Sequence, residues 1–266
     1  MSAGAAKDEL FLADEANKVV RVFNVRSGQL DARDVYRCPA GQDPDGVAYC
    51  AHTDTLFIAT CGRQRHIILS FARENTESEW RECNHIELTG YQPYHVSLCA
   101  LSDGSLVFGV RDYEKELRVL QVDDARAIQQ RARVKLPGTH CGVDAMLAGD
   151  ETWLAVALCT PNHAVALFRV DGTSTRGAKE LSRCALESAF EPLFCGDSVL
   201  VYGRSADNTG WEVHEFGTVG GRLEPRRVIL NVPDPQYFHA RTWCIGNGGL
   251  VAWNFEHLTL TIYSLM

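Results

Sequence analysis

The chain contains the apolar segment Thr55-Leu56-Phe57-Ile58-Ala59, and segments of the same pattern occur five more times along its 266 residues. Each segment has a leucine at its second position, and these anchoring leucines are Leu10, Leu56, Leu106, Leu154, Leu200 and Leu250. Successive leucines lie 46, 50, 48, 46 and 50 residues apart. A period of this length indicates a repeat architecture, in which one supersecondary unit recurs along the chain.

Each repeat has the pattern of four strands. The anchoring segment is apolar without interruption, as expected for a strand that is buried on both faces. Another apolar segment precedes it, for example Val96–Ala100, and turn residues such as Ser102-Asp103-Gly104 join the two. An alternating strand follows, as in Val165–Val170, and then a more polar one, as in Gln129–Leu136. This gradient from an apolar inner strand to a charged outer edge is typical of a propeller blade.

The sequence therefore predicts an all-β fold, a β-propeller of about six four-stranded blades in a single domain over residues 1–266. Residues 124–133 are the one candidate helix, and they lie where a turn into an outer strand is expected. The ends of the repeat do not match. No inner strand is visible before Leu10 and no outer strand after Tyr263. We expect that the first or the last blade is incomplete, or that the chain was cut from a longer protein.

The composition is that of an ordinary globular protein, with 45% hydrophobic and 23% charged residues. A formal net charge of −8 disfavours non-specific attraction to nucleic acids or anionic membranes. The longest apolar stretch is far shorter than the roughly 20 residues of a membrane helix, and the N-terminus lacks a signal-peptide pattern. The ten cysteines form no CxxC pair and follow the repeat, which predicts reduced, structural thiols. We expect a cytoplasmic or nuclear protein with no membrane partner.

Several stretches resemble known propeller repeats. Val96–Gly109 is similar to the inner half of a WD40 repeat and Val20–Gly28 to its third strand, although the Gly-His and Trp-Asp pairs are absent. Leu10–Phe23 resembles an NHL-type repeat equally well, as does Pro44–Ala48. The resemblance implies a propeller fold. Because NHL-type propellers commonly have six blades, it also agrees with the repeat count.

Candidate binding residues gather in two sets of loops that share one face of a propeller, around the mouth of its channel. The loops between an outer strand and the next inner strand carry Tyr91, Tyr94, His95, His140, Phe190, Tyr237, Phe238 and His239. The loops between the second and third strands add Arg63, Arg65 and Tyr113. Aromatic side chains on one rim are typical of protein interfaces, and arginine suits a carboxylate or phosphate. Alternatively, these residues only fill the channel and brace the loops.

We predict a non-catalytic scaffold that binds a protein or peptide segment on this loop face, without a cofactor or metal. The first alternative is an enzyme, since six-bladed propellers include metal-dependent lactonases and hydrolases. The expected inner strands offer few carboxylates apart from Asp144, and no HExxH, GxSxG or Walker-type motif is present.

The second alternative is RNA binding, which some NHL-type propellers perform through a basic face. The candidate basic residues are Arg126, Arg131, Arg133, Lys135, Arg226 and Arg227. Their place on outer strands favours protection of an exposed sheet edge instead, so nucleic acid is not the expected partner.

Overall fold

The computed structural model describes residues 2–3, 9–24, 31–62, 65–75, 78–89, 95–111, 114–122, 128–148, 151–160, 162–170, 178–205, 207, 210–232, 243–245, 249–254 and 259–264. Within these ranges the regular structure consists of 23 β-strands, which confirms the all-β prediction. None of the described residues belongs to a helix long and apolar enough to cross a membrane.

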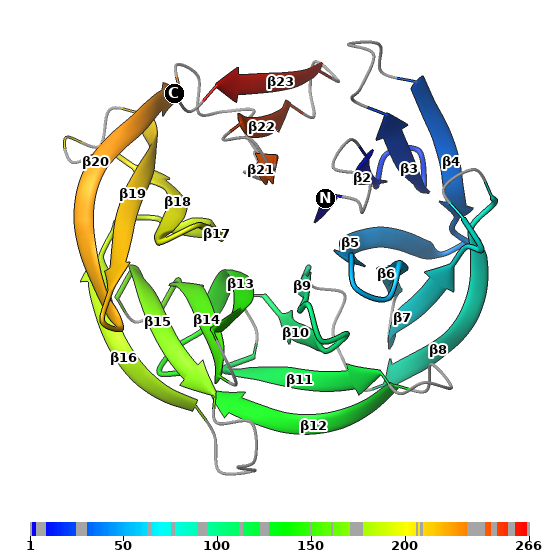
Figure 1. The fold of residues 1–266 in the computed structure, drawn as a ribbon, viewed down its shortest axis with the longest axis horizontal. Helices are drawn as coiled ribbons and strands as arrows, with labels where there is room; N and C mark the ends of the chain where they lie inside the picture. The colour runs from blue at the N-terminus through cyan, green and yellow to red at the C-terminus, as the bar shows by residue number, and fades with distance from the viewer. Residues whose placement is uncertain are drawn as a thin grey trace. The chain divides into compact units, whose positions relative to one another are not determined.

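The strands form six antiparallel sheets, and in each sheet the strands lie in sequence order (Figure 1). The first sheet contains β1 (Ser2–Ala3), β2 (Glu9–Asp14), β3 (Val19–Asn24) and β4 (Asp31–Arg37). The second contains β5 (Gln42–Cys50), β6 (Thr55–Gly62), β7 (Arg65–Ala72) and β8 (Arg81–Thr89). The third contains β9 (Val96–Ala100), β10 (Leu106–Val110), β11 (Glu116–Val122) and β12 (Ile128–Lys135).

The fourth sheet contains β13 (His140–Ala148), β14 (Glu151–Leu158), β15 (Ala164–Val170) and β16 (Ala178–Ala185). The fifth contains β17 (Phe190–Cys195), β18 (Ser198–Arg204), β19 (Trp211–Val219) and β20 (Arg222–Val232). The last contains β21 (Trp243–Ile245), β22 (Gly249–Asn254) and β23 (Thr259–Ser264). The chain divides into two compact units, of which unit 1 is Met1–Arg111 with Leu117–Ala132 and unit 2 is Asp112–Glu116 with Arg133–Met266.

The repeated segments of the sequence occupy equivalent positions in the strand pairing of their sheets. Leu56 of β6 pairs with Tyr49 on one side and with Phe71 on the other. Leu154 of β14 has the same place, between Ala145 and Phe168. The other anchoring leucines also lie in the second strand of their sheets. Five of the six are at most 2% exposed, as predicted for a strand covered on both faces.

Apolar layers between successive sheets explain why the anchoring segments do not alternate in polarity. In unit 1, Leu56 and Ile58 of β6 pack in a cluster with Phe11 of the first sheet. The residues that alternate with them in sequence, Phe57 and Ala59, pack against the third sheet. Because side chains of a strand alternate between its two faces, both sets must be apolar when a sheet has neighbours on both sides. In unit 2, a further cluster joins the fourth and fifth sheets.

The two ends of the chain build their sheets differently. The sequence showed no inner strand before Leu10, but the structure pairs Ser2 and Ala3 with β2, which completes a first sheet of four strands. The three-stranded sheet is the last one, β21–β23. Two residues are too few to show a periodicity, so β1 could not be found from the sequence.

Candidate functional site

The candidate residues that the structure describes lie at one edge of their sheets. In four successive antiparallel strands, the start of the first, the end of the second, the start of the third and the end of the fourth all meet at the same edge. We call this the loop edge of a sheet. His140 and Phe190 begin a first strand, His95 directly precedes one, and Arg65 begins a third strand.

In unit 1, the loop edge holds a buried carboxylate against an exposed imidazole. Asp45 occupies a bulge in β5, where the register with β6 shifts between Pro44 and Gly46. Its carboxylate accepts a hydrogen bond from the Val96 backbone N–H of the third sheet and lies 2.8 Å from His95 Nδ1. The side chain of Asp45 is 5% exposed and that of His95 is 67% exposed. The carboxylate therefore orients a ring that is open to solvent.

Arg111 completes the charged group at this edge. Its backbone N–H donates to the His95 carbonyl at 2.7 Å, and its Nε donates to Ser97 Oγ at 3.1 Å. The hydrogen bond to Asp45 raises the pKa of His95, while desolvation and the charge of Arg111 oppose this increase. The pair Asp45–His95 thus favours the imidazolium, close to a second cation.

In unit 2, the loop edge of the fifth sheet carries an aromatic cluster. The Trp211 ring stacks on Tyr202 with centroids 4.8 Å apart and planes at 12°, and lies 5.6 Å from the Phe190 ring. The Arg204 guanidinium lies over Trp211 at 5.4 Å from its centroid. Phe190, Trp211 and Arg204 are half-buried. The combination of tryptophan, tyrosine and arginine is the one that dominates binding energy in protein interfaces.

Other candidate residues have different surroundings. Arg65 is exposed and its guanidinium lies 3.4 Å from the Glu87 carboxylate of β8, so its charge is balanced within the sheet. His140 is fully buried and offers no surface to a partner. The remaining candidates lie outside the described residues, and these are Arg63, Tyr91, Tyr94, Tyr113, Tyr237, Phe238 and His239.

The sequence reasoning missed five residues of these sites, namely Asp45, Arg111, Tyr202, Arg204 and Trp211. The statement that the inner strands offer little besides Asp144 is wrong, because β5 also holds Asp45, which is 7% exposed. A carboxylate directly before the apolar segment Gly46–Cys50 was the available signal.

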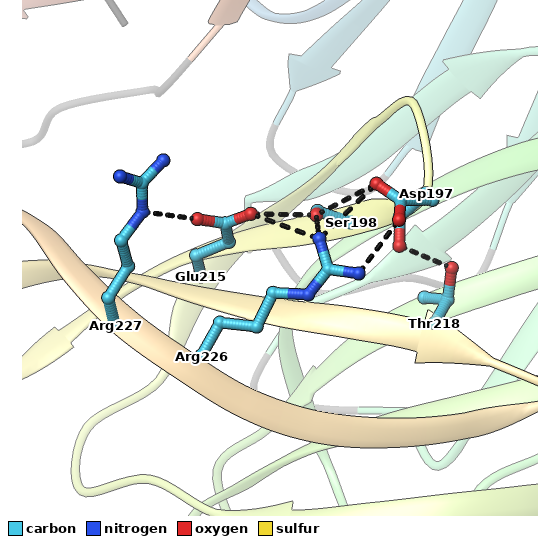
Figure 2. A network of polar contacts seen from close by, with 6 residues as sticks. All are labelled: Asp197, Ser198, Glu215, Thr218, Arg226 and Arg227. Atoms are coloured by element: carbon cyan, nitrogen blue, oxygen red, sulfur yellow. Dashed lines mark hydrogen bonds and ion pairs between the residues drawn. The ribbon is translucent and has the colours of Figure 1, made fainter. Parts of the chain in front are cut away.

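Four of the six basic residues considered for RNA are paired with carboxylates, and Arg126 lies outside the described residues. Figure 2 shows Arg226 between Asp197 and Glu215, with Nη2 at 2.7 Å from Asp197, and Arg227 on the other side of Glu215 at 2.8 Å. Arg133 lies 3.4 Å from Glu116 and Arg131 lies 4.0 Å from Asp103. Pairing of this kind fits the protection of outer strands.

The cysteines are not all reduced as predicted. Cys141 and Cys159 form a disulfide, with their Cα atoms 6.0 Å apart, so the prediction of reduced thiols is wrong for this pair. The bulge at Cys141, between His140 and Gly142, brings it to the end of β14. Cys50 and Cys99 are buried at the ends of inner strands and outside any disulfide, as predicted, whereas Cys195 at the equivalent place is half-buried. Among the described residues, no group of three or more His, Cys, Asp or Glu side chains could hold a metal ion.

Comparisons with known proteins identify the fold. No protein-family model and no curated protein sequence matches the chain. A protein from Lactobacillus plantarum aligns over 97% of this chain and 81% of its own, with a TM-score of 0.64 and 12% identity. Sqt1 from Saccharomyces cerevisiae aligns over 99% and 74%, with a TM-score of 0.56 and 8% identity. The WD40 domain of SCAP from fission yeast aligns over 96% and 62%, with a TM-score of 0.53 and 11% identity.

These identities are low enough that the likeness concerns the fold alone. It confirms the resemblance drawn from the sequence, because the chain has the repeated all-β fold of a WD40-like β-propeller.

Proposed function

We propose that the six sheets are the blades of one propeller that spans residues 1–266, and that the protein is a non-catalytic scaffold for a protein or peptide segment. The segment binds at the loop edges of the sheets. The likeness to the WD40 domain of SCAP supports a propeller.

The observation that carries this function is the aromatic cluster at the loop edge of the fifth sheet. Stacking against Tyr202 holds the Trp211 ring in one orientation, and a rigid aromatic group loses little conformational entropy when a partner packs on it. Arg204 adds a planar cation that can bond a carboxylate or a backbone carbonyl of the partner. Half-buried aromatic and arginine side chains are the usual anchors of an interface.

The test compares partner recovery by the full chain and by Trp211→Ala, quantified by mass spectrometry. Val219→Ala is the matched control, because Val219 is a 55% exposed apolar residue at the opposite end of β19. We expect a set of proteins that the wild type and Val219→Ala recover and Trp211→Ala loses, at a temperature well below the thermal midpoint of all three proteins. Equal recovery by Trp211→Ala would remove the cluster as the binding site.

The loops outside the described residues are tested separately. A Tyr94→Ala, Tyr237→Ala double variant changes one aromatic residue in each of two loops that the sequence places on the same face. Loss of the same proteins would extend the site to these loops, whereas unchanged recovery would confine it to the fifth sheet.

A further inference from the structure

His95 and Arg111, at the loop edge of the third sheet in unit 1, form with Asp45 a group that has the geometry of an anion-binding site. Asp45 belongs to the neighbouring sheet, and its carboxylate also accepts a hydrogen bond from the Val96 N–H. This second bond fixes the orientation of the carboxylate toward the His95 ring. Its contact with Nδ1 assigns that nitrogen to the carboxylate. The hydrogen bond at one ring nitrogen fixes the role of the other. Nε2 of His95 is therefore the donor that a ligand meets.

Arg111 supplies the second donor. Ser97 is 2% exposed and holds Nε of the guanidinium, which limits the orientations of the whole planar group. The backbone hydrogen bond from Arg111 to His95 keeps the two residues side by side on adjacent strands. The charge of Arg111 acts on the His95 ring, so both cations share one region. Two cationic donors in fixed positions are a common means of binding oxyanions.

Among the described residues, the charges of Asp45, Arg111 and Glu15 act on the imidazole. Asp45 on β5 and Arg111, directly after β10, act on it most strongly, and Glu15, in the turn between β2 and β3, contributes least. Protonated His95 carries a positive charge on a side chain that is 67% exposed, and the charge of Arg111 acts on the same ring.

We propose that His95 and Arg111 bind an oxyanion of the partner segment, either the carboxylate of an acidic side chain or the phosphate of a phosphorylated residue. This inference rests on the proposed scaffold function, since the partner segment carries the anion. Nε2–H of the imidazolium and the guanidinium donate to the anion, while Asp45 keeps the ring in place. Because the neutral imidazole has no charge to offer, affinity for the anion decreases by up to about tenfold for each pH unit above the pKa of His95.

The experiment follows the imidazole resonances of the full chain, labelled at histidine, by NMR between pH 5.5 and 7.5. The probes are inorganic phosphate, N-acetyl-phosphoserine amide and N-acetyl-glutamate amide, with N-acetyl-serine amide as the neutral control. We expect the anionic probes to shift the His95 resonances and raise the pKa of the ring. Binding should weaken by at least about tenfold in His95→Gln and in Arg111→Gln, because each loses a charge-assisted hydrogen bond.

The matched control is Arg81→Gln, which removes an exposed arginine of unit 1 at the start of β8, at the edge of the second sheet opposite to the loop edge. It should bind the probes as the wild type does. Absence of any shift at His95, or equal affinities in wild type and His95→Gln, would overturn the inference. The relative affinities of the phosphoserine and glutamate probes decide which anion the site prefers.

The two proposals fail in different ways. If partners bind wild type and His95→Gln with equal affinity at every pH, the anion site is refuted. The scaffold function then still stands. If the probes bind at His95 but Trp211→Ala recovers the same proteins as the wild type, the anion site stands. The aromatic cluster is then refuted as the partner site.

Discussion

Replacing Arg73 with methionine is expected to destabilise unit 1 by about 3–5 kcal/mol, because it breaks a buried ion pair between the first and second sheets. The Arg73 side chain has no exposed surface, and its two Nη atoms donate to Glu9 at 2.8 and 2.7 Å. Its Nε lies 3.3 Å from Asp54, and its guanidinium carbon lies 4.4 Å from the Trp80 ring centroid.

The magnitude follows from what the substitution leaves behind. Glu9 is 8% exposed, and without Arg73 its nearest cation is Arg33 at 3.7 Å, whose side chain is 50% exposed. When a buried carboxylate loses its main partner, the free-energy cost of its desolvation is no longer offset. Breaking such a pair typically costs about 3–5 kcal/mol. We place the value near the lower end, since Arg33 still screens part of the charge. The methionine fills much of the space of the arginine, so a cavity adds little.

The assay is equilibrium unfolding in guanidinium chloride, followed by circular dichroism, together with amide hydrogen exchange of β2 and β6. The double variant Glu9→Gln, Arg73→Met should recover part of the loss, because the buried charge is then gone as well. Arg37→Met is the control. Arg37 pairs with Asp34 at 2.8 Å, but the two side chains are 68% and 42% exposed, so its loss should cost less than about 1 kcal/mol.

Two results would refute this reasoning. One is an Arg73→Met variant no less stable than the Arg37→Met control. The other is a double variant as unstable as the single one, which would show that the loss comes from packing and not from the charge of Glu9.

Three further changes in unit 2 have expected outcomes. Burial raises the pKa of Asp144 to about 6, so its charge destabilises the fold increasingly from pH 4 to 6, and Asp144→Asn should be more stable by about 1–3 kcal/mol at pH 7.5 but not at pH 4. Unfolding midpoints at the two pH values check this, and an equal difference at both would contradict it. Gly142→Ala would place a Cβ 2.7 Å from the backbone N of Glu191, so we expect a lower thermal midpoint and a cost of about 1–3 kcal/mol. Loss of the disulfide in Cys141→Ser, Cys159→Ser should cost at most about 3 kcal/mol for a loop of 18 residues, and a midpoint unaffected by reductant in the wild type would argue against the bond.

The repeated strands could be predicted because their signal is local. Leu56, Leu106 and Leu154 recur in apolar segments because each second strand is covered on both faces. A strand in that position needs apolar residues at consecutive positions, and such a run is visible in the sequence. The polar outer strands were equally visible, since an exposed edge selects charge. Where only two residues pair, as in β1, no pattern exists to find.

The candidate site was only partly predictable. His95 and Phe190 could be selected by residue type and by their place before an inner strand. Their partners could not, because Asp45 is 50 residues from His95 and reaches it through a bulge. His140 has the same place in its repeat but is fully buried, which no residue type reveals.

The sequence by itself determined the repeat, the all-β class and the order of strands within each sheet, because strand periodicity and turn residues act over a few positions. Tertiary structure alone decided the contacts between sheets, including the pairing of Cys141 with Cys159, the Arg73 ion pair and the Asp45–His95 contact. Such contacts join residues from about 18 to 64 positions apart, and they depend on how bulges and stacked sheets place side chains. The periodicity of the sequence does not indicate where bulges and stacked sheets place these side chains.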